Sequence, residues 1–236
     1  MSYMNHPTNK ANVWDQLIRC KNNLLATLQT NLTQYEEPGM DRFNKDGWTN
    51  LTFRSGPIRR AHIDVVDARD TKGLWMMHLC IFPQLSNPGP IYGFDVIAGK
   101  NKVTGAFHDY SPTVDWNHPM CNLFRDCVQL LEWKKERELP PWAQAIFSKH
   151  MVAASNVKID EMDQVVTMAL DNLDMYFEEL PKYTSNTLDV DQIKRKQNRY
   201  CHYQKQNPHT PKAMAALGLD PVDIKHFIEE CLFPEV

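Results

Sequence analysis

The spacing of apolar residues changes twice along this chain, and that change limits the possible folds more than any other feature. Between residues 47 and 109 the apolar residues form short runs typical of β-strands, joined by short links. Strands joined in this way pair antiparallel, because a parallel pair needs a crossover of about a dozen residues. On both sides of this block the spacing is helical. We therefore expect one antiparallel sheet with helices packed against it.

Turn residues divide the central block into five expected strands, which cover residues 48–54, 58–68, 73–82, 91–99 and 100–110. Helical spacing predicts helices over residues 11–35, 119–133, 140–151, 158–180, 189–206 and 221–231. No repeat, low-complexity tract or domain-sized linker interrupts this order. The pattern predicts a single α+β domain over residues 1–236.

Composition argues against several classes of function. The chain has 236 residues and a formal net charge of −3, which speaks against nucleic-acid binding driven by overall charge. No apolar run reaches the roughly 18 residues that span a bilayer, and the first residues lack the apolar core of a signal peptide. The six cysteines are scattered without a CxxC pair, so we expect reduced thiols and no protein-bound iron–sulfur cluster or zinc finger. These features predict a cytoplasmic protein.

A carboxylate interrupts the apolar strand IYGFDVIAG, residues 91–99. Asp95 lies in the middle of this run, where an unpaired charge is costly. His62 and Asp64 are two residues apart on an earlier strand and share one face, and His78 is in the middle of the strand between. If these strands are neighbours, all four titratable side chains project from one side of the sheet. Such a group can hold proton donors ready near neutral pH.

Two other interpretations of these residues stay open. A buried histidine–aspartate pair can simply satisfy its own hydrogen bonds in a core, and structural pairs also shift pKa values. His62, Asp64 and His78 superficially match the two-histidine, one-carboxylate set that holds non-haem iron. In that class the second histidine usually lies much farther along a long β-domain, so we expect no metal here. The chain also lacks GxGxxG, a phosphate loop and GxSxG, which speaks against nucleotide use and a serine nucleophile elbow.

Seven segments from residue 61 onward resemble the ferredoxin-dependent bilin reductases and follow the order of that family. They are AHID (61–64), HLCIFP (78–83), PIYGFDVIAGKNKVTGA (90–106), DYSPT (109–113), RELPPW (137–142), ASNV (154–157) and YCHYQKQN (200–207). GFDVIAG together with RELPPW is a specific signal. The chain is most similar to the branch that forms phycocyanobilin.

The resemblance implies a three-layer α/β/α sandwich with a central antiparallel β-sheet. It implies that biliverdin IXα binds between the sheet and the C-terminal helices. It also implies reduction by an external, acidic [2Fe–2S] ferredoxin, one electron at a time through bilin radicals, with no bound metal or organic cofactor. We accordingly expect biliverdin IXα and ferredoxin as partners. The charge and hydropathy of the chain predict no nucleic acid and no membrane, and a monomer is the default because the sequence identifies no large exposed apolar patch.

The resemblance also implies roles for single residues. Asp95 matches the family's central aspartate, which protonates and hydrogen-bonds the pyrrole nitrogens and lactam oxygens. His78 matches its histidine partner, and His62 matches a second histidine involved in proton supply. Arg137, which opens RELPPW, matches an anchor for a propionate, and Thr104 stands where the family has a propionate-contacting serine.

Two departures from the family pattern bear on the product. Asp64 stands where the phycocyanobilin enzymes have a glutamate, and Pro208 stands where an aspartate often follows the asparagine. Aspartate is shorter by one methylene, roughly 1.5 Å, and direct proton transfer to the D-ring vinyl group is then expected to fail. We expect phycoerythrobilin, with phycocyanobilin as the alternative product. A bilin-binding carrier is a further alternative, although a carrier gains nothing from a donor pair formed by Asp95 and His78.

An acidic ferredoxin requires a basic surface on its partner. The densest basic run lies in the expected helix over residues 189–206 and consists of Lys194, Arg195, Lys196 and Arg199. Lys100 and Lys102 lie beside the strands of the expected site. An ordinary solvated helix face explains such a run equally well. The run is therefore a hypothesis for ferredoxin docking.

Overall fold

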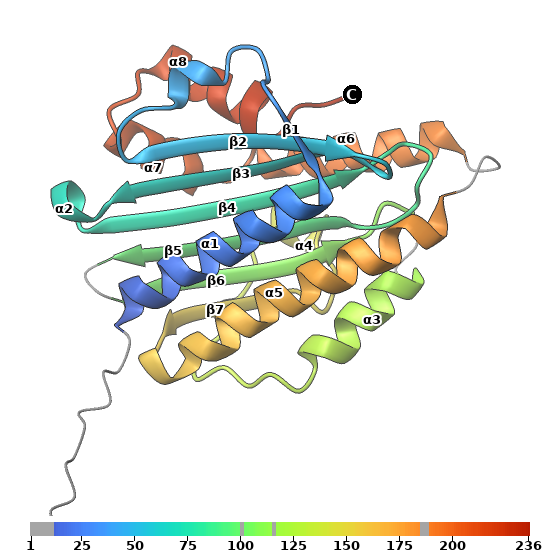
Figure 1. Cartoon of the computed structure of the whole chain (residues 1–236), viewed down its shortest axis with the longest axis horizontal. Coiled ribbons are helices and arrows are strands. Elements are labelled where there is room, and N and C mark those ends of the chain that lie inside the picture. Colours follow the sequence, from blue (N-terminus) through green and yellow to red (C-terminus); the bar gives the residue numbers. More distant parts are fainter. Residues whose placement is uncertain (1–11, 100–101, 115–116, 185–188) are drawn as a thin grey trace, which may run out of the picture.

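A computed structural model describes residues 12–99, 102–114, 117–184 and 189–236. In this part of the chain seven antiparallel strands form one sheet, and their order in space is their order in sequence (Figure 1). The strands are β1 (Thr33–Tyr35), β2 (Trp48–Ser55), β3 (Ile58–Ala68), β4 (Leu74–Pro83), β5 (Ile91–Gly99), β6 (Lys102–Ser111) and β7 (Val152–Val157). The predicted antiparallel sheet is confirmed.

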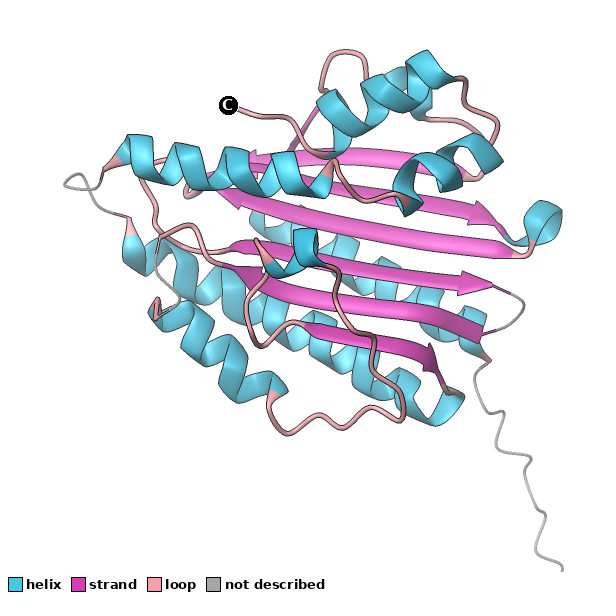
Figure 2. Ribbon diagram, turned by 180° about the vertical axis from the view of Figure 1, so that it is seen from behind, coloured by secondary structure: helices cyan, strands magenta, loops and turns pink. Residues whose placement is uncertain are grey.

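Helices cover both faces of the sheet (Figures 1 and 2), which confirms the α+β class and the three-layer sandwich. One face carries α1 (Val13–Asn31), α3 (Pro119–Val128) and α5 (Met162–Glu179). The other carries α4 (Pro141–Gln144), α6 (Val190–Gln204), α7 (His209–Ala216), α8 (Pro221–His226) and the π-helix η4 (Phe227–Leu232). A one-turn helix, α2 (Arg69–Lys72), links β3 to β4, and short 3-10 turns occupy Asp41–Phe43, Ile159–Glu161 and Leu180–Tyr183. No helix among these residues is long and apolar enough to cross a membrane.

The face under α1 and α5 is the main hydrophobic core. Strand β5 sends Tyr92, Phe94 and Val96 into it, and all three are fully buried. Burying a side chain of this size stabilises the fold by roughly 1.5–3 kcal/mol. The Tyr92 hydroxyl donates to the Ala169 carbonyl of α5 at 2.9 Å, which ties this helix to the sheet.

The opposite face is only partly covered. Helix α6 and the C-terminal helices lie over β2, β3 and β4 (Figure 2). Over β5 and β6 the cover is thinner, and Gly93, Asp95, Ile97 and Phe107 stay partly exposed. The alternation of β5 therefore places its apolar residues in the core and Asp95 on the half-open face.

Two of the predicted helices are much shorter in the structure, and the helix expected over 11–35 ends at Asn31, since Thr33–Tyr35 forms strand β1. The helix expected over 140–151 is limited to α4, because the backbone N–H of Ser148 donates to the Asp109 carboxylate at 2.9 Å. The helix expected over 119–133 ends at Val128. The chain beyond it runs beside β7, where the Arg137 N–H donates to the Ala153 carbonyl at 2.8 Å.

Strands β1 and β7 and helix α7 are not among the predicted elements. The helix expected over 221–231 is α8 followed by the π-helix η4. The Arg60 guanidinium of β3 donates to the Cys231 carbonyl of this π-helix at 2.5 Å, which ties η4 to the sheet. The extent of a single domain over residues 1–236 stays a prediction.

Candidate functional site

Strand register brings the predicted titratable residues together on the half-open face. Five residues on consecutive strands lie directly opposite one another and form one row across β2 to β6: Asn50, Asp64, His78, Asp95 and Phe107. The neighbouring row on the same face consists of Thr52, His62, Cys80, Gly93 and Asp109. Alternation along neighbouring strands thus places the four titratable residues on one face, as the sequence predicts.

His78 and Asp95 form an ion pair at the centre of the first row. His78 Nδ1 lies 2.6 Å from Asp95 Oδ1. The Asp95 side chain is 38% exposed and that of His78 only 13%, so the apolar strand does not bury this carboxylate. Burial alone would lower the pKa of His78, but the Asp95 carboxylate outweighs it and raises that pKa to about 10. At neutral pH the imidazole is therefore protonated and donates to Asp95.

The other nitrogen of His78 is enclosed by the C-terminal segment. His78 Nε2 is buried and has no hydrogen-bond partner among the described residues. The ring of Phe233 lies edge-on against the imidazole, with centroids 5.6 Å apart. Asn198 of α6 fixes the segment by exchanging two hydrogen bonds with the backbone of Val236, at 2.8 and 2.9 Å, and Lys205 pairs with Glu235 at 2.9 Å. The C-terminal segment is therefore held against His78.

The carboxyl group of Asp64 points toward strand β2. Its Oδ1 accepts a hydrogen bond from the indole nitrogen of Trp48 at 2.5 Å, and the residue is 4% exposed. Burial raises the pKa of the Asp64 carboxyl to about 6, although the Trp48 hydrogen bond and the nearby His78 lower it. This carboxyl can therefore gain or lose a proton near neutrality.

His62 is fully buried behind Asp64, and Asn50 joins the two. When the Asn50 amide is oriented so that both of its ends are satisfied, its nitrogen donates to His62 Nε2 at 3.1 Å and to Asp64 Oδ1 at 3.3 Å. Burial, together with the charges of Arg60 and His78, holds the pKa of His62 well below its usual range. His62 is thus a neutral ring.

Four further residues of the site are not among those that the sequence predicts. Trp48 and Asn50 contact Asp64, Phe233 contacts His78, and Tyr200 lies beside Gly93. Tyr200 lies in the YCHYQKQN segment, and its hydroxyl accepts from Gln204 at 2.8 Å. A Cβ added to Gly93 would lie 3.3 Å from this hydroxyl, so the missing side chain lets Tyr200 approach the sheet. Tyr200 could have been identified from the sequence, because it lies in one of the family segments. Trp48 and Asn50 lie in no such segment.

The predicted substrate-binding residues lie at the open side of the face. The exposed Arg137 guanidinium lies over the Phe107 ring, 5.3 Å from its centroid, and pairs with no described carboxylate. Thr104 stands at a bulge in β6, and its hydroxyl donates to the Ile97 carbonyl at 3.1 Å. Asn207, just before Pro208, accepts from the His209 N–H at 3.0 Å and so helps to start α7.

The predicted docking residues are exposed along α6: Lys194, Arg195, Lys196 and Arg199. Arg195 lies 3.7 Å from Asp189, and Arg199 lies over the Tyr203 ring at 5.3 Å. Lys102 begins β6 at the end of the sheet away from the start of α6 (Figure 1), so it does not extend this run. Lys100 lies outside the described residues.

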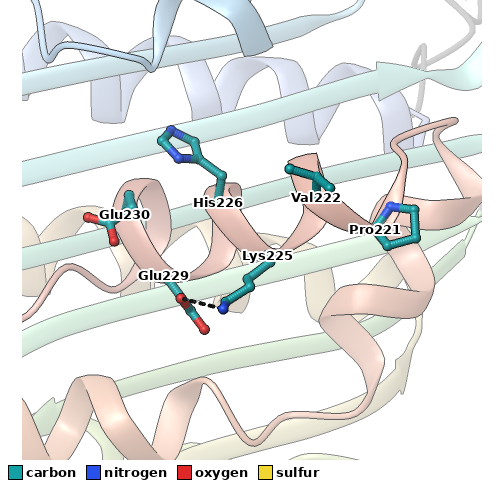
Figure 3. A pocket seen from close by; sticks show the side chains of 6 residues that line it. All are labelled: Pro221, Val222, Lys225, His226, Glu229 and Glu230. Atoms are coloured by element: carbon teal, nitrogen blue, oxygen red, sulfur yellow. Dashed lines mark ion pairs between the residues drawn. The ribbon is translucent and has the colours of Figure 1, made fainter.

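Two cavities lie away from the pair. A surface hollow of about 350 Å³ is lined by α8 and η4, where Lys225 and Glu229 are 4.0 Å apart (Figure 3). A second, of about 220 Å³, lies on the α1 side of the sheet. Within the described ranges no three His, Cys, Asp or Glu side chains are placed to hold a metal ion. His62, Asp64 and His78 instead bond to Asn50, Trp48 and Asp95.

Comparison with known proteins places this fold and site. The family model for "Ferredoxin-dependent bilin reductase" matches residues 25–234. A phycocyanobilin:ferredoxin oxidoreductase from Synechococcus sp. (strain CC9605) is 30% identical over 193 residues, 78% of this chain and 74% of that protein. The one from Gloeobacter violaceus is 27% identical over 187 residues, 78% of this chain and 72% of its own.

Two solved structures share the fold. The structure of PcyX is 40% identical to this chain, with a TM-score of 0.71 over 93% of this chain and 99% of its own. Phytochromobilin synthase from tomato, solved in complex with biliverdin, is 16% identical, with a TM-score of 0.73 over 90% of this chain and 82% of its own.

The class of protein is thus an α/β/α sandwich oxidoreductase with an imidazole–carboxylate pair on a half-covered sheet. The chain belongs to the ferredoxin-dependent bilin reductase family.

Proposed function

We propose that this chain reduces biliverdin IXα to phycoerythrobilin, with electrons delivered singly by an acidic [2Fe–2S] ferredoxin. The pigment gains four electrons and four protons, and four reduced ferredoxins are oxidised. One pair of electrons and protons saturates the bridge between the C and D rings, and the other pair reduces the A ring. The protein supplies protons and holds no redox group of its own.

The half-open face suits a flat, conjugated pigment. Met76, Ile97 and Phe107 are partly exposed around Asp95 and offer an apolar surface. The unpaired guanidinium of Arg137 stands beside Phe107 and can bind a propionate, by up to two charge-assisted hydrogen bonds. Thr104 would turn its hydroxyl from the Ile97 carbonyl to a second propionate contact.

The His78–Asp95 pair is the proposed proton source. It holds a proton between Nδ1 and Oδ1, and Asp95 is the more exposed partner, so Asp95 faces the pigment. Each electron added to the bilin raises its basicity, and a proton held within hydrogen-bonding reach can follow the electron. His62, neutral and buried behind Asp64, would take part in resupplying the proton.

The product assignment depends on one observation, the hydrogen bond from Trp48 to Asp64. The aspartate is roughly 1.5 Å shorter than a glutamate, and Oδ1 is engaged on the β2 side. Proton transfer needs donor and acceptor within about 3 Å or one bridging water. Asp64 is therefore too far from the D-ring vinyl group, and the radical is protonated at the bridge between the C and D rings.

Phycocyanobilin is the second candidate product, because the relatives that are 30% and 27% identical carry that name. Chromatography of the pigment formed from biliverdin, ferredoxin and a ferredoxin-reducing system separates the two. Phycoerythrobilin as the main product supports the proposal, and phycocyanobilin contradicts the product but leaves the reductase activity intact. Binding without any reduction would favour a carrier. The Asp64→Glu variant should move the product toward phycocyanobilin.

Docking of the ferredoxin is proposed at the basic run of α6. Its four cations are exposed on a helix that packs over the same face as the pair (Figure 2). Complementary charge steers an acidic partner and raises the association rate more than the final affinity. The cytoplasmic location and the monomeric state stay predictions.

A further inference from the structure

The Asp64 carboxyl is held from the side by strand β2. Trp48 and Asn50 both lie on this strand, and Asn50 is directly opposite Asp64 in the sheet. The Trp48 indole nitrogen donates to Asp64 Oδ1 at 2.5 Å, and the Asn50 amide nitrogen can donate to the same oxygen at 3.3 Å. The second oxygen, Oδ2, has no hydrogen bond to any described residue. An acid proton on Asp64 therefore belongs on Oδ2, because Oδ1 already accepts.

Trp48 is itself fixed in place. It is 2% exposed, and its ring packs against Phe43 with centroids 6.0 Å apart and edge-on against Phe227 at 5.0 Å. The Lys45 ammonium lies 5.2 Å from the ring centroid. An indole clamped on several sides cannot follow a moving carboxyl, so the carboxyl must stay where the indole is.

The Trp48 hydrogen bond thus fixes both the depth and the rotation of the Asp64 carboxyl. A free aspartate could turn about its Cα–Cβ bond and move its carboxyl oxygens by more than the length of one C–C bond, roughly 1.5 Å. A displacement of this size decides whether a carboxyl oxygen can reach a substrate carbon and transfer a proton to it.

We propose that Trp48 is a positioning residue that keeps the Asp64 carboxyl away from the D-ring vinyl group and thereby selects the product. This inference rests on the proposed function. Both products consume four electrons and four protons, and the A-ring reduction is the same in both. The remaining two protons go to the bridge carbon and the adjoining D-ring carbon in phycoerythrobilin, and to the two vinyl carbons in phycocyanobilin. When the indole N–H is absent, Asp64 turns toward the pigment and protonates the vinyl group.

The test replaces Trp48 by β-(3-benzothienyl)alanine, which keeps the bicyclic shape and has sulfur in place of the N–H. The matched control is the same replacement at Trp75, which is fully buried on the opposite face and whose Nε1 has no partner among the described residues. The Trp48→Phe variant removes the same N–H with a natural amino acid, together with part of the ring. Loss of one hydrogen bond predicts a rise of about fivefold or more in the ratio of phycocyanobilin to phycoerythrobilin. The control should leave the ratio unchanged.

Two further measurements show whether Trp48 acts through Asp64. In the Asp64→Asn background the replacement at Trp48 should leave the product ratio unchanged. The second measurement uses bilin-free protein and follows the infrared band of the protonated Asp64 carboxyl, which is assigned by its loss in Asp64→Asn. After replacement of Trp48 this band should persist to higher pH than in the unmodified protein. The reason is that the Trp48 hydrogen bond lowers the pKa of Asp64.

An unchanged ratio after replacement of Trp48 overturns the inference, as does an equal change in the Trp75 control or in the Asp64→Asn background. The product of the unmodified protein tests the proposed function separately. If that product is phycocyanobilin, the product assignment fails and the role of Trp48 fails with it. If the product is phycoerythrobilin and the ratio does not respond to Trp48, the inference alone fails.

Discussion

The Phe233 ring packs nearly perpendicular to the His78 imidazole, and Nδ1 of the same imidazole lies 2.6 Å from Asp95 Oδ1. Phe233 is 4% exposed and His78 Nε2 is buried, so we expect the phenyl ring to shield this nitrogen from water. The Phe233→Ala variant should expose this nitrogen, and the Nε2 proton should exchange with solvent at least about tenfold faster by NMR. Stability should fall by about 3 kcal/mol, the usual cost of removing a buried phenyl ring.

Phe147→Ala is the matched control. Phe147 packs against Tyr200 and Trp142 on the same side of the sheet. Its loss should destabilise the protein in chemical denaturation without changing the exchange of the His78 proton. Equal exchange rates in the two variants would show that Phe233 does not shield His78.

Asp95→Asn should keep the pigment bound and slow its reduction by about two to four orders of magnitude. The amide has the shape of the carboxyl but neither donates an acid proton nor holds the His78 imidazolium by charge. Electrons from ferredoxin should still arrive, so a bilin radical should accumulate and be visible by electron paramagnetic resonance. Turnover at the rate of the unmodified protein would remove Asp95 from the mechanism.

The His78–Asp95 pair should make stability depend on alkaline pH. The folded-state pKa of His78 is raised from 6.5 to about 10. The folded protein therefore holds this proton more tightly than the unfolded chain does, and the added stability is complete below about pH 6.5 and lost as the pH rises through about 10. His78→Gln should cost about 1 kcal/mol near neutral pH, a modest value because Asp95 is partly exposed.

Urea denaturation of His78→Gln and of the unmodified protein at several pH values between 6 and 10 measures this effect. The difference in free energy of unfolding between the two proteins should shrink with rising pH. A difference that stays constant across the range would mean that the histidine is neutral in the folded protein.

Arg137→Gln should weaken biliverdin binding by about tenfold and change the rate of the bound pigment little. The guanidinium is exposed and pairs with no described carboxylate, so its loss removes a substrate contact rather than an internal ion pair. Biliverdin dimethyl ester, which lacks the propionate charges, should bind equally to both proteins in a fluorescence titration. An unchanged affinity for biliverdin itself would contradict the anchor role.

Reversal of charge at Arg195 and Arg199 should raise the ferredoxin concentration needed for half-maximal rate by about tenfold, with most of the effect lost between about 20 and 200 mM salt. The control reverses Arg19 of α1 and Lys182 of the turn after α5, which are also exposed and lie on the side of the sheet opposite α6. Both double variants have the same net charge. Equal effects would indicate a general charge effect and no docking at α6.

The sequence predicts which face a strand residue occupies, and this is why the row of Asp64, His78 and Asp95 could be expected. Alternation fixes the side of the sheet, and short links fix which strands are neighbours. The rotamer of a side chain is not fixed by alternation. Asp64 turns toward Trp48, 16 residues earlier in the chain, because the indole N–H is buried and needs an acceptor.

The exposure of Asp95 also could not be predicted from its strand. An apolar run such as 91–99 indicates burial on both faces, and β5 is buried on the side of Phe94. How far the other side is covered depends on α6 and on the segment around Arg137, which come from distant parts of the chain. Strand β7 is not predicted either, because Ala153 and Ala154 leave little alternation between apolar and polar residues in this segment.

The link between β4 and β5, residues 84–90, controls whether the pair can form. Asn87 donates to the Leu180 carbonyl at 2.8 Å and accepts from the Gly89 N–H at 2.8 Å. A Cβ at Gly89 would lie 2.2 Å from the Leu180 side chain. By contrast, the link between β3 and β4 is the one-turn helix α2, which is exposed over residues 70–72.

These two links should differ in how they accept a change of length. One residue added to or lost from 84–90 would shift β5 against β4, and a shift of one position turns Asp95 to the far side of the sheet. The same change within α2 projects into solvent and leaves every strand in place. Insertions and deletions in relatives of this chain should therefore collect at α2, while the length of 84–90 stays constant.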